Sequence, residues 1–232
     1  MHAFITGTGT GVGKTHVTTL MLRALRDTGR TVCGFKPISC GGREDAQAIL
    51  EASSPGFSLD EINPVALKTP AAPHVACQFE GRSIDRNSLI EGFHSLAGRA
   101  DHVLVEGAGG WAVPVSPGLT MADLAADLKL PVIVVVDNRL GALNHTILTV
   151  EAIQGKGLQC AGLILNHLAD ERDMASITNR QTLEEWLGIP VLEDVLHAED
   201  HLDPQWVLEA LAPAAGKNLQ SALAASPPCG NR

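Results

Sequence analysis

The stretch GTGTGVGKT, residues 7–15, decides the fold. It follows a short apolar run and precedes a helical pattern, the arrangement in which bare backbone N–H groups and a helix N-terminus face a phosphate. Its glycines at alternate positions predict close backbone approach and positive φ. Lys14 can reach the β- and γ-phosphates of a nucleotide, and the Thr15 hydroxyl can bind Mg²⁺. The stretch therefore predicts a phosphate-binding loop rather than a glycine-rich turn without a ligand.

The spacing of this loop separates it from three better-known glycine patterns. In G-x-x-x-x-G-K-[ST] the first glycine would stand at Thr8, so Gly7 lies one residue too far out. The dinucleotide fingerprint G-x-G-x-x-G lacks its third glycine here in either register and gives Lys-Thr no role. The K-G-G-x-G-K-T loop of partitioning ATPases needs a lysine at position 9, which is Gly9. A regulatory ATPase of that type stays an alternative, without its signature residue.

The composition of the chain restricts its partners and its compartment. The 232 residues are 45% hydrophobic and carry a formal net charge of −9. No basic patch is visible, so we expect neither nucleic acid nor an anionic membrane as a partner. The five cysteines are odd in number and form no C-x-x-C pair, which indicates free thiols in a reducing compartment. Without a signal-peptide pattern or an apolar run long enough to span a bilayer, we expect a cytoplasmic protein.

Apolar runs alternate with helical patterns along the chain. Strands are expected in short runs at residues 3–6, 31–35, 102–105, 132–136, 160–165 and 189–192. Helices are expected from Lys14 towards Gly29, and at residues 120–130, 143–153 and 175–187. This order predicts an α/β fold, a P-loop NTPase-like parallel sheet with helices on both faces in a single domain, residues 1–213. Residues 214–232, rich in small side chains, are expected to be a poorly ordered tail.

Local signals mark where some of these elements begin. Thr120 and Asp123 form a capping box that opens the helix to Leu130. Asp45 opens another helical pattern, where it would act as an N-cap. Residues 53–72, interrupted by prolines, form the longest irregular connection, and we interpret them as a loop over the active face.

Two charged residues stand at the ends of predicted strands. Glu106 ends the strand in HVLVEGAGG, and Lys36 follows another strand in extended conformation because Pro37 comes next. In a parallel sheet both lie at the carboxyl edge, where ligand sites form. A carboxylate there can hold Mg²⁺, and the glycines at 107–110 offer backbone donors to another anion. These residues therefore predict a second part of the nucleotide site.

Other catalytic patterns are weak or missing. His197 and His201 have the i, i+4 spacing of metal ligands but no third ligand, so we interpret them as solvated surface residues. The sequence contains no G-x-S-x-G elbow and no recognisable catalytic cysteine signature.

Five segments, taken in order, resemble the dethiobiotin synthetase family. They are GTGTGVGKT at 7–15, FKPISCG at 35–41, VEGAGGW at 105–111, RLGALNH at 139–145 and LILNH at 163–167. The motifs Ile62-Asn-Pro and Ala72-Pro-His fit the intervening loop of that family. Its phosphate loop has five residues between the first glycine and GKT, so Gly7 takes the first place and the extra residue belongs to the pattern.

The resemblance implies an ATP-dependent carbon–nitrogen ligase of biotin biosynthesis. Such an enzyme closes a cyclic urea on 7,8-diaminopelargonic acid, using CO₂ and Mg²⁺. One amine becomes a carbamate, ATP converts it to a mixed anhydride, and the second amine closes the ring as phosphate leaves. A synthetase domain of a cobyrinic-acid-type amidotransferase is the remaining alternative, but it needs a second domain with a Cys-His-Glu site, for which this chain is too short.

The resemblance also implies roles for individual residues. Lys36, Lys14 and Thr10 would be catalytic, and Thr15, Asp45 and Glu106 would be the Mg²⁺ ligands. The nucleotide contacts would be Gly11, Val12, Gly13, Lys14, Thr15, His16, Asp45, Glu106, Gly107, Ala108, Gly109 and Asn166. The substrate contacts would be Thr10, Lys36, Cys40, Gly109, Gly110, Leu140, Gly141, Leu143 and Asn144, the last four from the neighbouring subunit of a homodimer.

Two departures from the family pattern leave points open. Cys40 stands where the family has Ser or Thr, and a thiol is the weaker hydrogen-bond partner. Residues 193–197 replace a G-x-I/V-P turn that helps to hold the base, so the selectivity for ATP over other triphosphates is not decided by the sequence.

Overall fold

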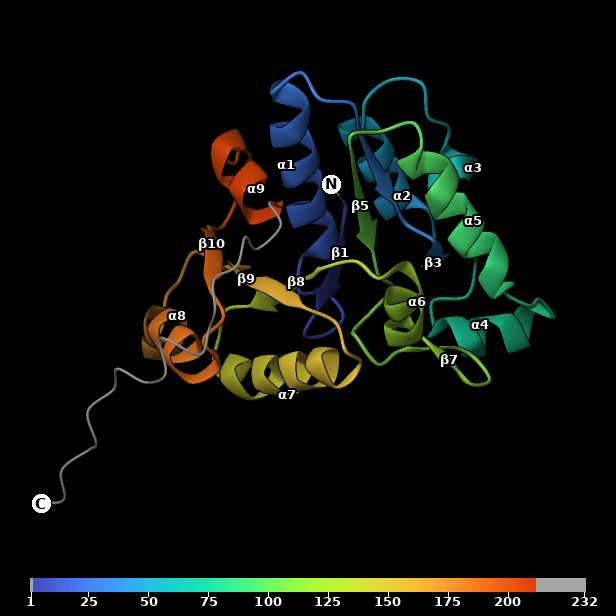
Figure 1. The fold of residues 1–232 in the computed structure, drawn as a ribbon. Helices are drawn as coiled ribbons and strands as arrows, with labels where there is room; N and C mark the ends of the chain where they lie inside the picture. The colour runs from blue at the N-terminus through green and yellow to red at the C-terminus, as the bar shows by residue number, and fades with distance from the viewer. Residues whose placement is uncertain (1, 212–232) are drawn as a thin grey trace, which may run out of the picture.

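A six-stranded parallel sheet forms the centre of the computed structural model, which describes residues 2–211 (Figure 1). Its strands are β1 (His2–Gly7), β2 (Val32–Phe35), β5 (His102–Glu106), β8 (Val132–Asp137), β9 (Cys160–Asn166) and β10 (Val191–Val195). Their order is β10-β9-β8-β1-β5-β2, and neighbours run parallel. The expected α/β fold is confirmed. The boundary at residue 213 and the tail expected at 214–232 lie outside the described residues.

Helices cover both faces of the sheet. On one face α1 (Lys14–Asp27) packs against α2 (Glu44–Ala52) and α9 (Pro204–Leu211). The other face carries α5 (Arg86–Ala97), α6 (Met121–Leu128), α7 (Ala142–Gly155) and α8 (Met174–Leu187), and Figure 1 shows α7 and α8 across the sheet from α1 and α9. Because both faces are covered, every residue of β2 and β5 is buried, as the continuous apolar runs predict.

The helix ends follow local sequence signals, with one exception. The four helices expected from the sequence lie within two residues of their predicted bounds. The capping box at α6 is confirmed, since the Thr120 N–H donates to Asp123 Oδ2 over 2.8 Å and the Asp123 N–H donates to Thr120 Oγ1. The N-cap assigned to Asp45 is wrong, because α2 begins at Glu44 with Arg43 as its N-cap and no side-chain cap. The Asp45 carboxylate is therefore free for another partner.

Residues 53–72 are less irregular than the prolines suggest, which corrects the expectation of one open loop. A capping box of Ser58 and Glu61 starts the short helix α3 (Leu59–Ile62). The strand β4 (Val65–Leu67) follows and pairs in parallel with β3 (Ile38–Cys40). Beyond this segment lie α4 (Pro73–Glu80) and an antiparallel pair, β6 (Pro114–Ser116) with β7 (Leu119–Thr120).

The topology brings the predicted functional segments together at one edge of the sheet. The strands β2, β5 and β1 are neighbours and parallel, and they end at Phe35, Glu106 and Gly7. The residues that follow each strand therefore meet above the carboxyl ends, with α1 starting at the same place. In the described part of the chain, no helix combines the length and apolar character needed to cross a membrane.

Candidate functional site

A cavity of about 820 Å³ opens above the carboxyl ends of β1, β2 and β5. It brings together most of the predicted site residues: Thr10, Gly11, Gly13, Lys14, Thr15, His16, Lys36, Cys40, Asp45, Glu106, Ala108 and Gly109. It also has lining residues that the sequence did not single out, among them Ile38, Ser39, Gly42, Glu44 and Val113. The volume suits a small-molecule site of the kind that binds a nucleotide or a second substrate.

The glycines of the phosphate loop serve two different needs. Gly11 and Gly13 have φ of 76° and 85°, whereas Gly7 does not adopt positive φ, so the expectation for every alternate glycine is wrong. Gly7 is required by close approach instead, since a Cβ there would lie 2.6 Å from Val12 Cγ2. A Cβ on Gly13 would come within 2.0 Å of Asn166 Nδ2. The loop is therefore closed tightly on itself and on the end of β9.

Lys14 is folded back over this loop. Its Nζ donates to the Gly9 carbonyl over 3.0 Å, and the residue is buried. Burial, together with the nearby charge of Lys36, lowers the pKa of Lys14 to about 8, although Glu106 and Asp45 act in the opposite direction. An ammonium held this way, beside the N-terminus of α1, is positioned to meet an anionic phosphate.

Lys36 lies between two carboxylates. Its Nζ is 2.5 Å from Glu106 Oε1 and 3.4 Å from Asp45 Oδ2, and its side chain is 6% exposed. Burial disfavours the charged amine, but the two carboxylates outweigh burial and raise the pKa of Lys36 above its ordinary value. The lysine therefore stays protonated. It lies at the carboxyl edge of the sheet, as its place after β2 predicts.

Of the residues expected to hold Mg²⁺, Thr15 contacts Glu106 directly and Asp45 is joined to it through Lys36, and the Glu106 side chain is 0% exposed. The Thr15 hydroxyl donates to Glu106 Oε1 over 2.8 Å, while the buried Oε2 of Glu106 has no hydrogen-bond partner among the described residues. Two carboxylates and a hydroxyl are the hard oxygen donors that suit Mg²⁺ when a nucleotide and waters supply the other ligands. This donor set fits such an ion.

No separate metal centre competes with this site in the part of the chain that the structure covers. Within residues 2–211, no group of three or more His, Cys, Asp or Glu side chains could hold a metal ion. His197 and His201 are both exposed, as expected.

The buried amide of Asn63 holds the backbone at Lys36. The sequence did not single this residue out individually. Asn63 Nδ2 donates to the Lys36 carbonyl over 2.7 Å, and Asn63 Oδ1 accepts from Ser39 Oγ and Arg43 Nε. Asn63 is 1% exposed, so these bonds satisfy a polar group that would otherwise be costly to bury. Its motif, Ile62-Asn-Pro, is therefore a positioning element for Lys36.

The glycine run after β5 contributes less backbone donor capacity than the sequence suggests. The Gly107 N–H donates to the Ile5 carbonyl over 3.0 Å, so it is already used within the sheet. Gly109 has φ of 66°, and a Cβ on Gly110 would lie 3.5 Å from the Cα of Gly9. The run is thus packed backbone to backbone against the phosphate loop, so the two glycine-rich segments lie side by side.

Cys40 lines the cavity as a half-buried, neutral group. Burial is the main reason that the pKa of its thiol rises to about 11. Its part of the cavity wall also includes Pro70, Ala71 and Pro73, so the segment after β4 does lie over the active face. The four cysteines within residues 2–211 are free, as expected.

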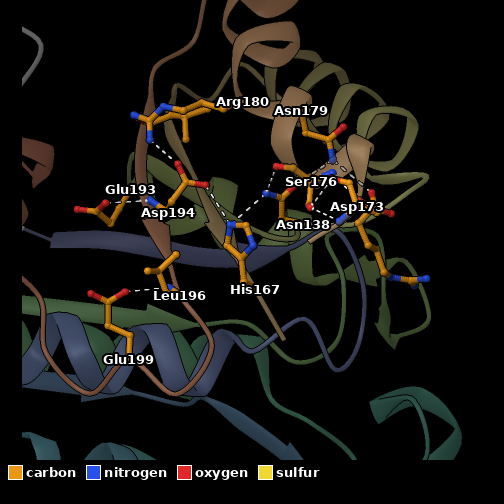
Figure 2. A network of polar contacts seen from close by, with 12 residues as sticks. Asn138, His167, Asp173, Ser176, Asn179, Arg180, Glu193, Asp194, Leu196 and Glu199 are labelled. Carbon is orange, nitrogen blue, oxygen red and sulfur yellow. Dashed lines mark hydrogen bonds and ion pairs between the residues drawn. The ribbon is translucent and has the colours of Figure 1, made fainter. Parts of the chain in front are cut away.

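Outside the cavity lining, at the carboxyl ends of β9 and β10, lies a network of polar side chains (Figure 2). Asn166 Nδ2 donates to the Val12 carbonyl over 2.9 Å and so joins this end to the phosphate loop. The next residue, His167, places Nε2 3.2 Å from both Asn138 Nδ2 and Asp194 Oδ1. Asp194 in turn pairs with Arg180 from α8. Nothing in the local sequence around 193–197 predicts this closed network.

The segment Leu140 to Asn144 lies apart from the cavity lining. It opens α7, with Gly141 as N-cap at φ of 93°, and Leu140 is 79% exposed. The structure of one chain therefore does not bring this predicted substrate segment to its own cavity.

Relatives of known name resemble nearly the whole chain. The chain is 43% identical over 207 residues to the ATP-dependent dethiobiotin synthetase of Akkermansia muciniphila, covering 89% of this chain and 97% of that protein. It is 42% identical over 216 residues to the enzyme of the same name from Aromatoleum aromaticum, covering 90% and 95%. The chain belongs to the dethiobiotin synthetase family. A family model described as an AAA domain also matches residues 2–204.

Solved structures place the dethiobiotin synthetase chain in a wider fold. The cell division ATPase MinD of Pyrococcus furiosus superposes with a TM-score of 0.54 at 19% identity, covering 90% of this chain and 88% of that one. Apo McdA of Cyanthece gives a TM-score of 0.58 at 13% identity, covering 91% and 99%. At these identities the likeness concerns the P-loop NTPase fold alone.

Proposed function

We propose that this chain closes the ureido ring of dethiobiotin on 7,8-diaminopelargonic acid, using CO₂ and ATP, as a step of biotin biosynthesis. One observation carries the proposal: a single cavity is lined both by residues of the phosphate loop and by Lys36, Glu106 and part of the glycine run. A reaction that joins a carbamate to the γ-phosphate needs two anions held close together. Family membership supplies the identity of the substrate.

The chain's own residues divide the reaction between them. Carboxylation of one amine gives a carbamate, whose oxygen attacks the γ-phosphorus and expels ADP. The second amine then attacks the carbonyl carbon of the mixed anhydride, the carbon–oxygen bond breaks, and phosphate leaves. Lys14 and Lys36 reduce the repulsion between the anions, and Thr10 and the exposed side of the glycine run would orient the diamine and the carbamate. Residues 11–16, the second half of the phosphate loop and the residue after it, would bind the nucleotide.

Mg²⁺ would be held by Thr15, Asp45 and Glu106. When bound, it would neutralise charge on the phosphate oxygens and keep the nucleotide in register. The buried Glu106 carboxylate is suited to this task because it cannot be screened by solvent.

The substrate carboxylate would be bound in trans, by residues 140–144 of a second copy in a homodimer. Leu140 is exposed at the start of α7, and Leu148, Met174 and Ile177 are exposed on the packed pair α7 and α8. Large exposed apolar side chains of this kind favour a subunit interface. The N-terminus of α7 suits a carboxylate.

A subunit-mixing experiment tests the dimer. Lys36→Gln damages one half of each site and Asn144→Ala damages the half given to the partner, so a mixed dimer keeps one complete site. Co-expression should restore about a quarter of wild-type activity from two inactive variants, as random pairing in a twofold dimer requires. Sedimentation should show a dimer at assay concentration, and a fully active monomer would exclude a site shared between subunits.

The remaining assignments concern the nucleotide and the compartment. Asn166 lies beside the phosphate loop, where it would contact the adenine. The free thiols within the described residues are consistent with a cytoplasmic protein.

Phosphate release from ATP and Mg²⁺ tests the function directly. It should depend on both diaminopelargonic acid and bicarbonate, with dethiobiotin formed in equal amount. An analogue with one amine replaced by hydrogen is the matched control, since it can form a carbamate but no ring. Phosphate release of the same rate without the diamine would make the chain an ATPase and refute the proposal.

A further inference from the structure

The position between Glu106 and Asp45 is filled by a cation of the protein itself. Lys36 Nζ contacts Glu106 Oε1 at 2.5 Å and Asp45 Oδ2 at 3.4 Å. The Thr15 hydroxyl reaches the same Oε1 atom over 2.8 Å. The three residues assigned to the metal therefore surround the lysine ammonium, directly or through the oxygen it contacts.

Lys36 and a divalent ion cannot both use these oxygens in this arrangement. Thr15 and Lys36 both contact Oε1 of Glu106, which lines the cavity, whereas Oε2 is buried and has no partner among the described residues. Two cations a few ångströms apart in a partly buried site repel each other strongly. Glu106 is also fully buried, and a buried carboxylate is costly without a cation beside it.

We propose that Lys36 is an exchangeable counter-ion, which neutralises Glu106 and Asp45 until a divalent cation replaces it and turns its ammonium toward the phosphates. The proposal rests on the proposed function for the assignment of Thr15, Asp45 and Glu106 as metal ligands. Metal binding and the turning of the Lys36 ammonium then occur together, so the lysine contacts the reacting phosphate only when the metal is bound.

Titration with Mg²⁺ alone, followed by calorimetry, tests the exchange without any turnover. Lys36→Met removes the competing cation, so Mg²⁺ should bind at least about tenfold more tightly than to the wild type. Lys14→Met is the matched control: it removes the same charge from the same cavity, but Lys14 Nζ bonds to the Gly9 carbonyl and to neither carboxylate. Its Mg²⁺ affinity should change clearly less than that of Lys36→Met, because Lys14 contacts neither carboxylate.

Thermal unfolding gives a second reading of the same variants. Lys36→Met leaves Glu106 buried without its cation, so its melting temperature should fall, and Mg²⁺ should raise it by more than it raises that of the wild type. Equal Mg²⁺ affinity in Lys36→Met and the wild type, or no binding to either, would overturn the exchange.

A measurement on the wild type covers the case in which Lys36→Met does not fold. Trace acylation with acetic anhydride, read by peptide mass spectrometry, reports how accessible each lysine is. Mg²⁺ should increase labelling of Lys36 relative to the exposed Lys129, because the released ammonium leaves its ion pairs. Unchanged labelling while calorimetry shows Mg²⁺ bound would refute the proposal. Neither result depends on ring closure, so failure of the exchange and failure of the proposed function are separate outcomes.

Discussion

The two ends of the sheet's carboxyl edge are built by different means. The phosphate end consists of glycine backbone and charges placed at the ends of neighbouring strands, with Lys14 and Lys36 less than a tenth exposed. The other end, which the family resemblance assigns to the base and which we call the base end, lies outside the cavity lining, where Asn138, His167 and Asp194 satisfy one another (Figure 2). We expect the first end to stabilise charge in the transition state and the second to hold the shape of the neighbouring segment. Substitutions at the first end should therefore lower turnover, whereas those at the second should change nucleotide affinity with little effect on turnover.

The largest effect is expected for Lys14→Gln at the phosphate end. Lys14 makes one hydrogen bond within the loop, to the Gly9 carbonyl, so the fold should survive its loss. Both nucleotide binding and turnover should fall, with turnover lower by a factor of roughly 10² to 10³. Steady-state kinetics with circular dichroism as a folding control measures this. Normal turnover in a folded variant would contradict the assignment of the phosphate loop.

Lys36→Gln should separate kcat from nucleotide affinity. Its charge matters more in the transition state than in the ground state, so kcat should fall by a factor of roughly 10² to 10³. ATP affinity, which depends mainly on Lys14 and the loop, should change little. Lys36→Arg should not restore full activity, because a planar guanidinium does not fit between Glu106 and Asp45 as a compact ammonium does. Kinetics and direct ATP titration of both variants decide this, and an unchanged kcat for Lys36→Gln would remove the lysine from the chemistry.

At the base end, Asp194→Asn should raise the KM for ATP by a few-fold to about tenfold and leave kcat nearly unchanged. The change weakens the contacts of Asp194 with His167 and Arg180, which hold the segment that follows Asn166. Asp127→Asn is the control, because it weakens an ion pair with Arg86 between α6 and α5 instead. The KM values for ATP and GTP measure the effect. A loss of kcat equal to that of Lys36→Gln would end the distinction between the two ends.

The smallest effect is expected for Cys40→Ser. The pKa of about 11 keeps the Cys40 thiol protonated near neutral pH, and a hydroxyl can replace it in the cavity wall. Turnover should stay within about threefold of the wild type or increase. Alkylation of Cys40 by iodoacetamide at neutral pH should be slow, as followed by mass spectrometry. Loss of activity in Cys40→Ser would show that the thiol has a role of its own.

The same contrast explains what could be predicted from the sequence. The phosphate loop, Lys36 and Glu106 could be placed because glycine spacing and strand ends are local signals in a parallel sheet. The helix α5 was not predicted, although Leu89, Phe93 and Leu96 are buried at helical spacing. Two other contacts could not be predicted, because they join segments that share no sequence pattern. They are the pairing of β3 with β4 and the hydrogen bond from Asn63 to the Lys36 carbonyl.

The base end and the trans segment lay beyond such reasoning for a physical reason. His167, Asn138 and Asp194 are brought together by three parallel strands, and each is unremarkable in its own segment. The exposed Leu140 has its predicted meaning only in a second copy of the chain. The resemblance to a family, carried by short motifs, named Leu140 and Asn166 but not Asn138, His167 or Asp194.

The central claim is that the γ-phosphate of ATP is transferred to a carbamate oxygen in this cavity. Oxygen-isotope labelling tests this claim most directly. With ¹⁸O-labelled bicarbonate in a short reaction, ring closure should leave a single ¹⁸O atom in each phosphate released, because the bridging oxygen of the anhydride departs with phosphorus. Mass spectrometry of the phosphate gives the number of ¹⁸O atoms in each phosphate, and the dethiobiotin formed is measured in the same sample. Phosphate that carries no label from bicarbonate, and takes its new oxygen from water instead, would contradict the account.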